Sequence, residues 1–181
     1  GWARALSTES STHPGLTLEF YSTFKTHSSK GELNAISFQM FGQKLWMPKK
    51  NLAEIFGFKD SWKMEEKEVR IAYKFNLNTV WRELGIDQAQ VLKVPRATML
   101  KSLSLKYAHR LLTTTICGRG DSTGNVTEGD YFLLYCMMHE IKINGVIWII
   151  KMFKKVSENK GGKICGGGLI TSIAAALEFP F

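Results

Sequence analysis

Cysteine and histidine are the residues of this chain that could bind a metal ion or attack a substrate. The chain has three cysteines, Cys117, Cys136 and Cys165, and four histidines. Cys136 and His139 have the C-x-x-H spacing of half a zinc site, but the sequence contains no C-x-x-C pair to complete it. Widely spaced cysteines in odd number argue against a disulfide framework and are typical of buried thiols in a reducing compartment. We therefore predict no metal site, no cofactor, and an intracellular location, cytoplasmic or nuclear.

The segment GRGDSTG, residues 118–124, contains three short patterns that carry chemistry in other proteins. Its RGD tripeptide is an adhesion signal only in an exported protein. The DSTG portion has one residue too many for the Asp-Ser/Thr-Gly turn of retroviral-type proteases, and no Gly-Lys-Ser/Thr follows to bind phosphate. His109 is expected on the polar side of the preceding helix, and the carboxylates show no spacing of a catalytic pair. We predict a flexible helix–helix connection here, no catalytic residue and no small-molecule substrate.

Lysine is distributed unevenly along the chain. The 24 Lys and Arg residues outnumber the 16 Asp and Glu residues, which gives a net charge of +8, and a basic domain attracts phosphate-rich partners. Residues 142–163 hold six lysines against Glu158 alone. A solvated helix face would explain this pattern; the alternative is a surface that contacts RNA or DNA. The candidate nucleic-acid-binding residues are Lys142, Lys151, Lys154, Lys155, Lys160 and Lys163.

The elements that would position these residues are mostly helices. A chain of 181 residues with 44% hydrophobic content suits one globular domain, and the absence of a long apolar run indicates no membrane span. We predict a loose lead-in over residues 1–13 and a compact, mainly α domain over residues 14–181. A small N-terminal β-hairpin is expected around 35–47, where AISFQMF and KLWM are joined through Gly42-Gln43. Core helices are expected around 98–117, 128–142, 145–157 and 168–178.

Apolar periodicity indicates how these helices would be oriented. In the first, Leu100, Leu103, Tyr107, Leu111 and Leu112 form an apolar stripe. The run YFLLYCMM, residues 131–138, is apolar on all sides, as expected of a central buried helix. Thr127 and Asp130, which precede this run, resemble a capping box. In the third helix the expected inner stripe is Val146, Ile149, Ile150 and Phe153, with Lys151, Lys154 and Lys155 facing out. Residues 59–74, with few apolar positions, are expected to form an exposed loop.

Several segments of the chain together resemble one known family. They are LTLEFYSTFKTHSSKGELNAISFQMFGQKLWMP, NLAEIFGF, FNLNTVWRELG, HRLLTTTICGRGDSTGNVTEGDYFLLYCMMHEIKING and KGGKICGGGLITSIAAALEF. From about Leu16 onward the chain is similar to the first-open-reading-frame domain of plant retroelements of the Athila type, in the Ty3/gypsy class. The charged stretch MEEKEVRIAYK is a departure from that family's pattern.

The resemblance implies an α-rich, transposon-encoded protein without established enzymatic activity. The sequence contains neither the Tyr-x-Asp-Asp of reverse transcriptases nor the C-x-x-C-x4-H-x4-C zinc knuckle of gag proteins. We expect a non-enzymatic, gag-like structural or assembly domain that self-associates and contacts RNA or DNA through its basic face. The alternative is a domesticated protein–protein interaction module without nucleic-acid binding. A divergent nuclease using Asp121 and Asp130 is a third hypothesis.

Overall fold

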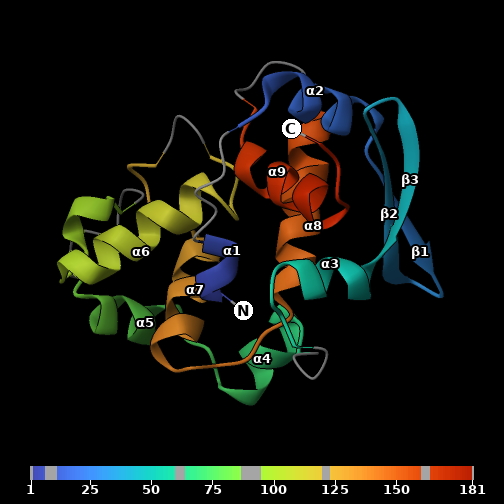
Figure 1. The fold of residues 1–181 in the computed structure, drawn as a ribbon. Helices are drawn as coiled ribbons and strands as arrows, with labels where there is room; N and C mark the ends of the chain where they lie inside the picture. The colour runs from blue at the N-terminus through green and yellow to red at the C-terminus, as the bar shows by residue number, and fades with distance from the viewer. Residues whose placement is uncertain are drawn as a thin grey trace.

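The computed structural model describes residues 2–6, 12–59, 64–86, 95–119, 123–159 and 164–180. Helices predominate among them, as the sequence predicts, and one small antiparallel sheet lies at the edge of the molecule (Figure 1). None of the helices in these ranges combines the length and the apolar character that crossing a membrane requires.

The sheet differs from the predicted N-terminal hairpin in size and position. Its strands β1 (Lys25–Ser29), β2 (Glu32–Met40) and β3 (Gln43–Pro48) are antiparallel in the order β1-β2-β3. The expected hairpin around 35–47 lies within β2 and β3, but the sheet has a third strand and follows two helices in the chain. The sequence of β1, KTHSS, has no apolar alternation, so β1 could not be recognised from periodicity.

A carboxylate from a neighbouring helix holds the β2–β3 turn. Phe41 and Gly42 both have positive φ, 51° and 76°, as a two-residue turn with the twist of a hairpin requires. Positive φ is costly for a bulky residue such as Phe41. Glu19 of α2 (Pro14–Thr23) accepts hydrogen bonds from the Phe41 and Gly42 amides at 2.8 and 2.7 Å. Glu19 therefore ties the sheet to α2 and offsets this cost.

The N-terminal residues 1–13 are not uniformly a loose lead-in. Trp2–Leu6 form the short helix α1, in which Ala5 is fully buried. The Trp2 ring packs edge-on against Phe58 at a centroid distance of 5.3 Å. This packing explains why α1 is ordered although its sequence carries little apolar pattern.

The charged segment 59–74 contains a helix where we expected a loop. After α3 (Lys49–Ile55), α4 spans Glu66–Ala72. The side chain of Glu68 accepts a 2.7 Å hydrogen bond from the Glu65 amide in a capping box, and Val69 is fully buried. Arg70 of this helix also pairs with Glu66 and Glu128 and packs over the Phe132 ring. The prediction failed because it counted apolar positions alone.

Helix α6 presents a different face to the core from the one predicted. It follows α5 (Leu77–Leu84), which is capped by the Asn76 side chain, and a short 3-10 turn over Ala97–Met99. In α6 (Leu103–Thr114), Leu103 and Tyr107 are 83% and 66% exposed, whereas His109 is buried. We expected His109 on the polar side of the helix as a solvated or hydrogen-bonded residue; it is hydrogen bonded to Asp130 and not solvated.

Helices α7 (Glu128–Met138), α8 (Gly145–Glu158) and α9 (Gly167–Ala176) supply much of the core. The predicted central position of α7 and the predicted inner stripe of α8 are confirmed by their burial. Phe153 of α8 meets Phe20 of α2 at a ring distance of 4.9 Å. At the start of α8, a Cβ on Gly145 would lie 2.2 Å from the Phe58 ring, so only glycine fits there.

Candidate nucleic-acid interface

Three of the candidate lysines lie together on the outer face of α8. Lys151, Lys154 and Lys155 are exposed, and their spacing of three and four residues places them on one side of a helix. Lys142 is also exposed but lies in the loop between α7 and α8 and not on the helix. Lys160 and Lys163 lie outside the described residues. We call Lys151, Lys154 and Lys155 the α8 lysine face.

Two neighbouring side chains shape the α8 lysine face. The Lys151 ammonium lies over the Trp148 ring at 5.8 Å from its centroid, a cation–π contact. Lys154 Nζ lies 3.9 Å from Glu158, an exposed pair worth little in free energy. The charge of the face is therefore only weakly compensated.

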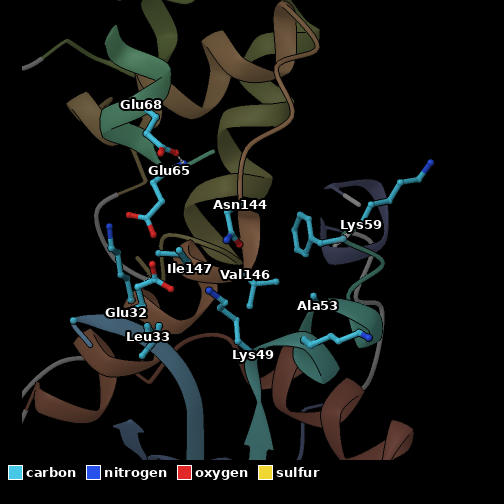
Figure 2. Close-up of a pocket in the computed structure, with 14 residues that line it drawn as sticks. Glu32, Leu33, Lys49, Ala53, Lys59, Glu65, Glu68, Asn144, Val146 and Ile147 are labelled. Carbon is cyan, nitrogen blue, oxygen red and sulfur yellow. Dashed lines mark hydrogen bonds between the residues drawn. The ribbon is translucent and has the colours of Figure 1, made fainter. Parts of the chain in front are cut away.

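An open cleft of about 750 Å³ borders Lys151. Glu32, Glu65 and Lys49 converge on it from three separate segments, whereas Lys59 extends away (Figure 2). The cleft mixes lysines and glutamates, so it does not enlarge the basic surface. Its lining comprises Gly31, Glu32, Leu33, Lys49, Lys50, Ala53, Phe58, Lys59, Glu65, Glu68, Asn144, Val146, Ile147 and Lys151.

Next to the α8 lysine face, a smaller groove of about 210 Å³ does extend the basic surface. Lys151, Lys155 and Arg119 line it together with Trp148 and the start of α7 at Thr127. The groove runs between α8 and the residues that follow α6. It brings an aromatic side chain and several cationic side chains to one place, a combination suited to a phosphate-bearing ligand.

A buried polar cluster around Asp130 forms the floor of this groove. Asp130 is 1% exposed, and its Oδ2 accepts a hydrogen bond from the Thr127 amide at 2.7 Å, which completes the predicted capping box. Arg119 donates to the same oxygen, and His109 Nε2 lies 3.3 Å from it. The Cys117 thiol donates to Oδ1 at 3.4 Å. One carboxylate thus joins α6, the loop after it and α7.

The electrostatics of the cluster favour a structural role. Burial raises the pKa of Asp130, but hydrogen bonds from His109 and Thr127 and the charge of Arg119 outweigh it, so the pKa lies below its usual value. Burial, reinforced by the Asp130 charge, raises the pKa of the Cys117 thiol to about 12. A thiol with such a pKa is not an activated nucleophile, and it donates to Asp130 instead of to His109.

The sequence did not predict this cluster. His109, Cys117, Arg119 and Asp130 lie on separate elements and have no spacing that indicates contact. The Thr127–Asp130 capping box was the only available signal, and it accounts for one hydrogen bond of Asp130. Although histidine, cysteine and aspartate are metal-binding residue types, no group of three or more such side chains in the described ranges is placed to hold a metal ion.

Cys136 and His139 do not form half of a zinc site. Cys136 is buried in the core, and burial raises the pKa of its thiol to about 12. His139 is exposed at the end of α7, where its Nε2 lies 2.7 Å from Glu83 Oε2. Residues 120–122 of the GRGDSTG segment lie outside the described residues. Arg119, in the same segment, donates a hydrogen bond to Asp130 and so connects the segment to α7.

The fold and these surfaces describe a largely helical protein with a basic face. The model of the ATHILA ORF-1 family matches residues 6–142, about three quarters of the chain, and the chain belongs to that family of retrotransposon proteins. No curated protein and no solved structure matches the chain. The matched residues end before α8, but α8 and α9 pack into the same core as α2, as the contact of Phe153 with Phe20 illustrates.

Proposed function

We propose that the chain is a non-enzymatic, gag-like structural protein of an Athila-type retrotransposon that binds the phosphate backbone of RNA or DNA. The observation that carries this proposal is the α8 lysine face. Lys151, Lys154 and Lys155 are exposed on one side of a helix whose opposite side is buried in the core. The helix therefore fixes the spacing of the three lysines along one face, from which their flexible side chains can reach neighbouring phosphates.

The expected binding is electrostatic and independent of sequence. Lysines that neutralise phosphates release condensed counterions, and affinity then falls steeply with salt. The groove beside α8 would add Arg119, whose side chain is 11% exposed. Because Arg119 already holds Asp130, we assign it a supporting role and give the main contacts to the lysines.

The Asp130 cluster supports the non-enzymatic part of the proposal. Cys117, His109 and Asp130 are residue types that serve as nucleophile, base and acid in enzymes. In this cluster, however, Asp130 already accepts hydrogen bonds from its neighbours, and the raised pKa of the Cys117 thiol keeps it protonated. A divergent nuclease that used Asp130 would need this carboxylate to bind metal, and Arg119 occupies it instead. Asp121 lies outside the described residues.

A domesticated protein–protein interaction module remains the alternative function. The observation in its favour is the exposed pair Leu103 and Tyr107, one turn apart on the outer face of α6. Exposed apolar residues grouped in this way mark contact surfaces. Sedimentation of the wild-type chain and a Leu103→Ser/Tyr107→Ser variant, together with nucleic-acid retention at low salt, would test it. Association of the wild type alone, without retention of RNA or DNA, supports the module, and monomers in both argue against it.

Filter binding at low salt, with RNA and duplex DNA side by side, tests nucleic-acid binding. The variant is Lys151→Gln/Lys154→Gln/Lys155→Gln. Its matched control replaces Lys74, which follows α4, Lys101, which precedes α6, and Lys106, which lies in α6, with glutamine and removes the same net charge. We expect about tenfold weaker retention for the α8 variant only. Failure of the wild-type chain to bind either nucleic acid at low salt would refute the proposal.

A further inference from the structure

The side of the sheet that points away from the helices forms a second surface, separate from the α8 lysine face. We call it the outer sheet face. Successive strand residues point to opposite sides of a sheet. In β2, Ile36, Phe38 and Met40 are buried on the side covered by helices, so Ser37 and Gln39 point outward. In Figure 1 the helices α2, α3 and α8 lie on one side of the sheet, and none of the helices that the structure describes covers the other side.

Strand register places two lysines and a tryptophan on this outer face. The cross-strand partners of Ser37 are Lys25 on β1 and Trp46 on β3, and the partner of Gln39 is Lys44. Both lysines are exposed. Trp46 is 60% exposed, which is unusual for a side chain that gains so much from burial.

A second aromatic ring holds Trp46 in place. The His27 imidazole, on the opposite edge strand, packs against the indole at a centroid distance of 4.1 Å and an interplanar angle of 39°. His27 Nε2 in turn lies 2.8 Å from Ser37 Oγ on the central strand. The indole is thus supported across all three strands while most of its surface remains accessible.

We propose that this outer sheet face binds single-stranded nucleic acid, with a base stacked on Trp46 and phosphates contacting Lys25 and Lys44. Exposed aromatic rings between cationic side chains are what unpaired bases and their backbone require. The register shifts between His27 and Ser28, and beyond this point Glu32 pairs with Ser29 at the end of the sheet. At the regularly paired positions before the shift, the residues on the outward side are Lys25, His27, Ala35, Ser37, Gln39, Lys44, Trp46 and Pro48; none is acidic, and Ala35 is buried among its larger neighbours. A face with lysines and no acidic residue favours a negatively charged polymer over a positively charged or neutral partner.

The inference deepens the proposed function, on which it rests, by naming the form of nucleic acid. Bases inside a duplex are stacked on each other and offer no free face to Trp46. The α8 lysine face would contact phosphates alone, so it would bind single-stranded and duplex nucleic acid alike. The sheet face should therefore contribute to binding of single strands and leave duplex binding unchanged.

The test measures affinity of the full chain for a labelled single-stranded oligoribonucleotide about ten nucleotides long, and for its duplex. The variants are Trp46→Ala, Trp46→Phe and Lys25→Gln/Lys44→Gln. Tyr107→Ala is the matched control, because it removes a similarly exposed ring, 66% accessible, from α6. Circular dichroism melting of each variant verifies that the fold is retained.

We expect Trp46→Ala to weaken single-strand binding about tenfold, Trp46→Phe to recover most of it, and Tyr107→Ala to have no effect. Lys25→Gln/Lys44→Gln should reduce the salt dependence of single-strand binding. Equal single-strand affinity of Trp46→Ala and wild type would overturn the inference, and so would an equal loss for single strand and duplex. The α8 triple variant separates the two proposals: if it binds normally while Trp46→Ala does not, nucleic-acid binding and the sheet inference stand, and the assignment of binding to the α8 lysine face fails.

Discussion

At the scale of single residues, Asp130 is the side chain on which most of the local structure depends. It caps α7 through the Thr127 amide, holds Arg119, and contacts His109 and Cys117. A buried carboxylate is tolerated only when it is paired and hydrogen bonded. The same contacts that make it tolerable also lower its pKa, so its contribution to stability depends on pH.

Replacement of Asp130 should destabilise the fold strongly at neutral pH. Asp130→Asn leaves Arg119 buried without its charge partner, and we expect a loss of about 2–4 kcal/mol in the free energy of unfolding. Urea unfolding followed by circular dichroism measures it. Glu128→Gln, which removes a 62% exposed carboxylate from the same helix, is the control and should cost less than about 1 kcal/mol. Similar losses for both variants would contradict this role.

The Asp130 effect should disappear in acid. The folded-state pKa of Asp130 lies below its unfolded value, so its stabilisation is complete above the unfolded pKa, about 3.9, and is lost as pH falls through the folded pKa. The difference in unfolding free energy between wild type and Asp130→Asn should be constant near neutrality and shrink below about pH 4. A difference that stays constant into acid would show that the carboxylate is not the stabilising form.

Two thiols should be unreactive in the folded protein. Burial raises the pKa of Cys117 and of Cys136 to about 12, and alkylation proceeds through the thiolate. Iodoacetamide at mildly alkaline pH should label both cysteines in the urea-unfolded protein. In the folded protein, both should be labelled much more slowly. Peptide mass spectrometry gives the rate at each site. Rapid native labelling of Cys117 would indicate an activated thiol and reopen a catalytic role for the cluster.

At the scale of elements, the helices with strong apolar patterns were predictable and those held by tertiary contacts were not. The spacing of apolar residues alone was enough to predict that α7 is buried and which side of α8 faces the core. By contrast, α6 has leucines on both sides, and burial of His109 against Asp130 selects which side faces inward. Strand β1 exists because β2 pairs with it, although its own sequence lacks a strand pattern.

The start of α8 depends on close approach to Phe58. Gly145→Ala would place a Cβ 2.2 Å from that ring, and we expect a net loss of about 1–3 kcal/mol despite the better helix propensity of alanine. Gly129→Ala in α7 is the matched control, because its Cβ would meet Trp148 at an ordinary 3.5 Å. Thermal melting compares them: equal or greater destabilisation by Gly129→Ala would contradict the packing at Gly145.

At the scale of the whole molecule, one core carries two separate polar surfaces. Contacts such as Phe20 with Phe153 join the residues matched by the family model to α8 beyond them. The α8 lysine face and the outer sheet face therefore have fixed positions on one body. The lysine cluster was visible in the sequence as a charge bias, whereas the sheet face required the register of three strands.

The salt dependence of nucleic-acid binding tests the central claim most directly. For wild type and Lys151→Gln/Lys154→Gln/Lys155→Gln, the logarithm of the binding constant is measured against the logarithm of salt concentration on duplex DNA. Each phosphate contact contributes about 0.9 to the slope, so we predict that the variant's slope is shallower by about 2 to 3. Identical slopes would show that the α8 lysine face does not contact the backbone, and would contradict the proposed function.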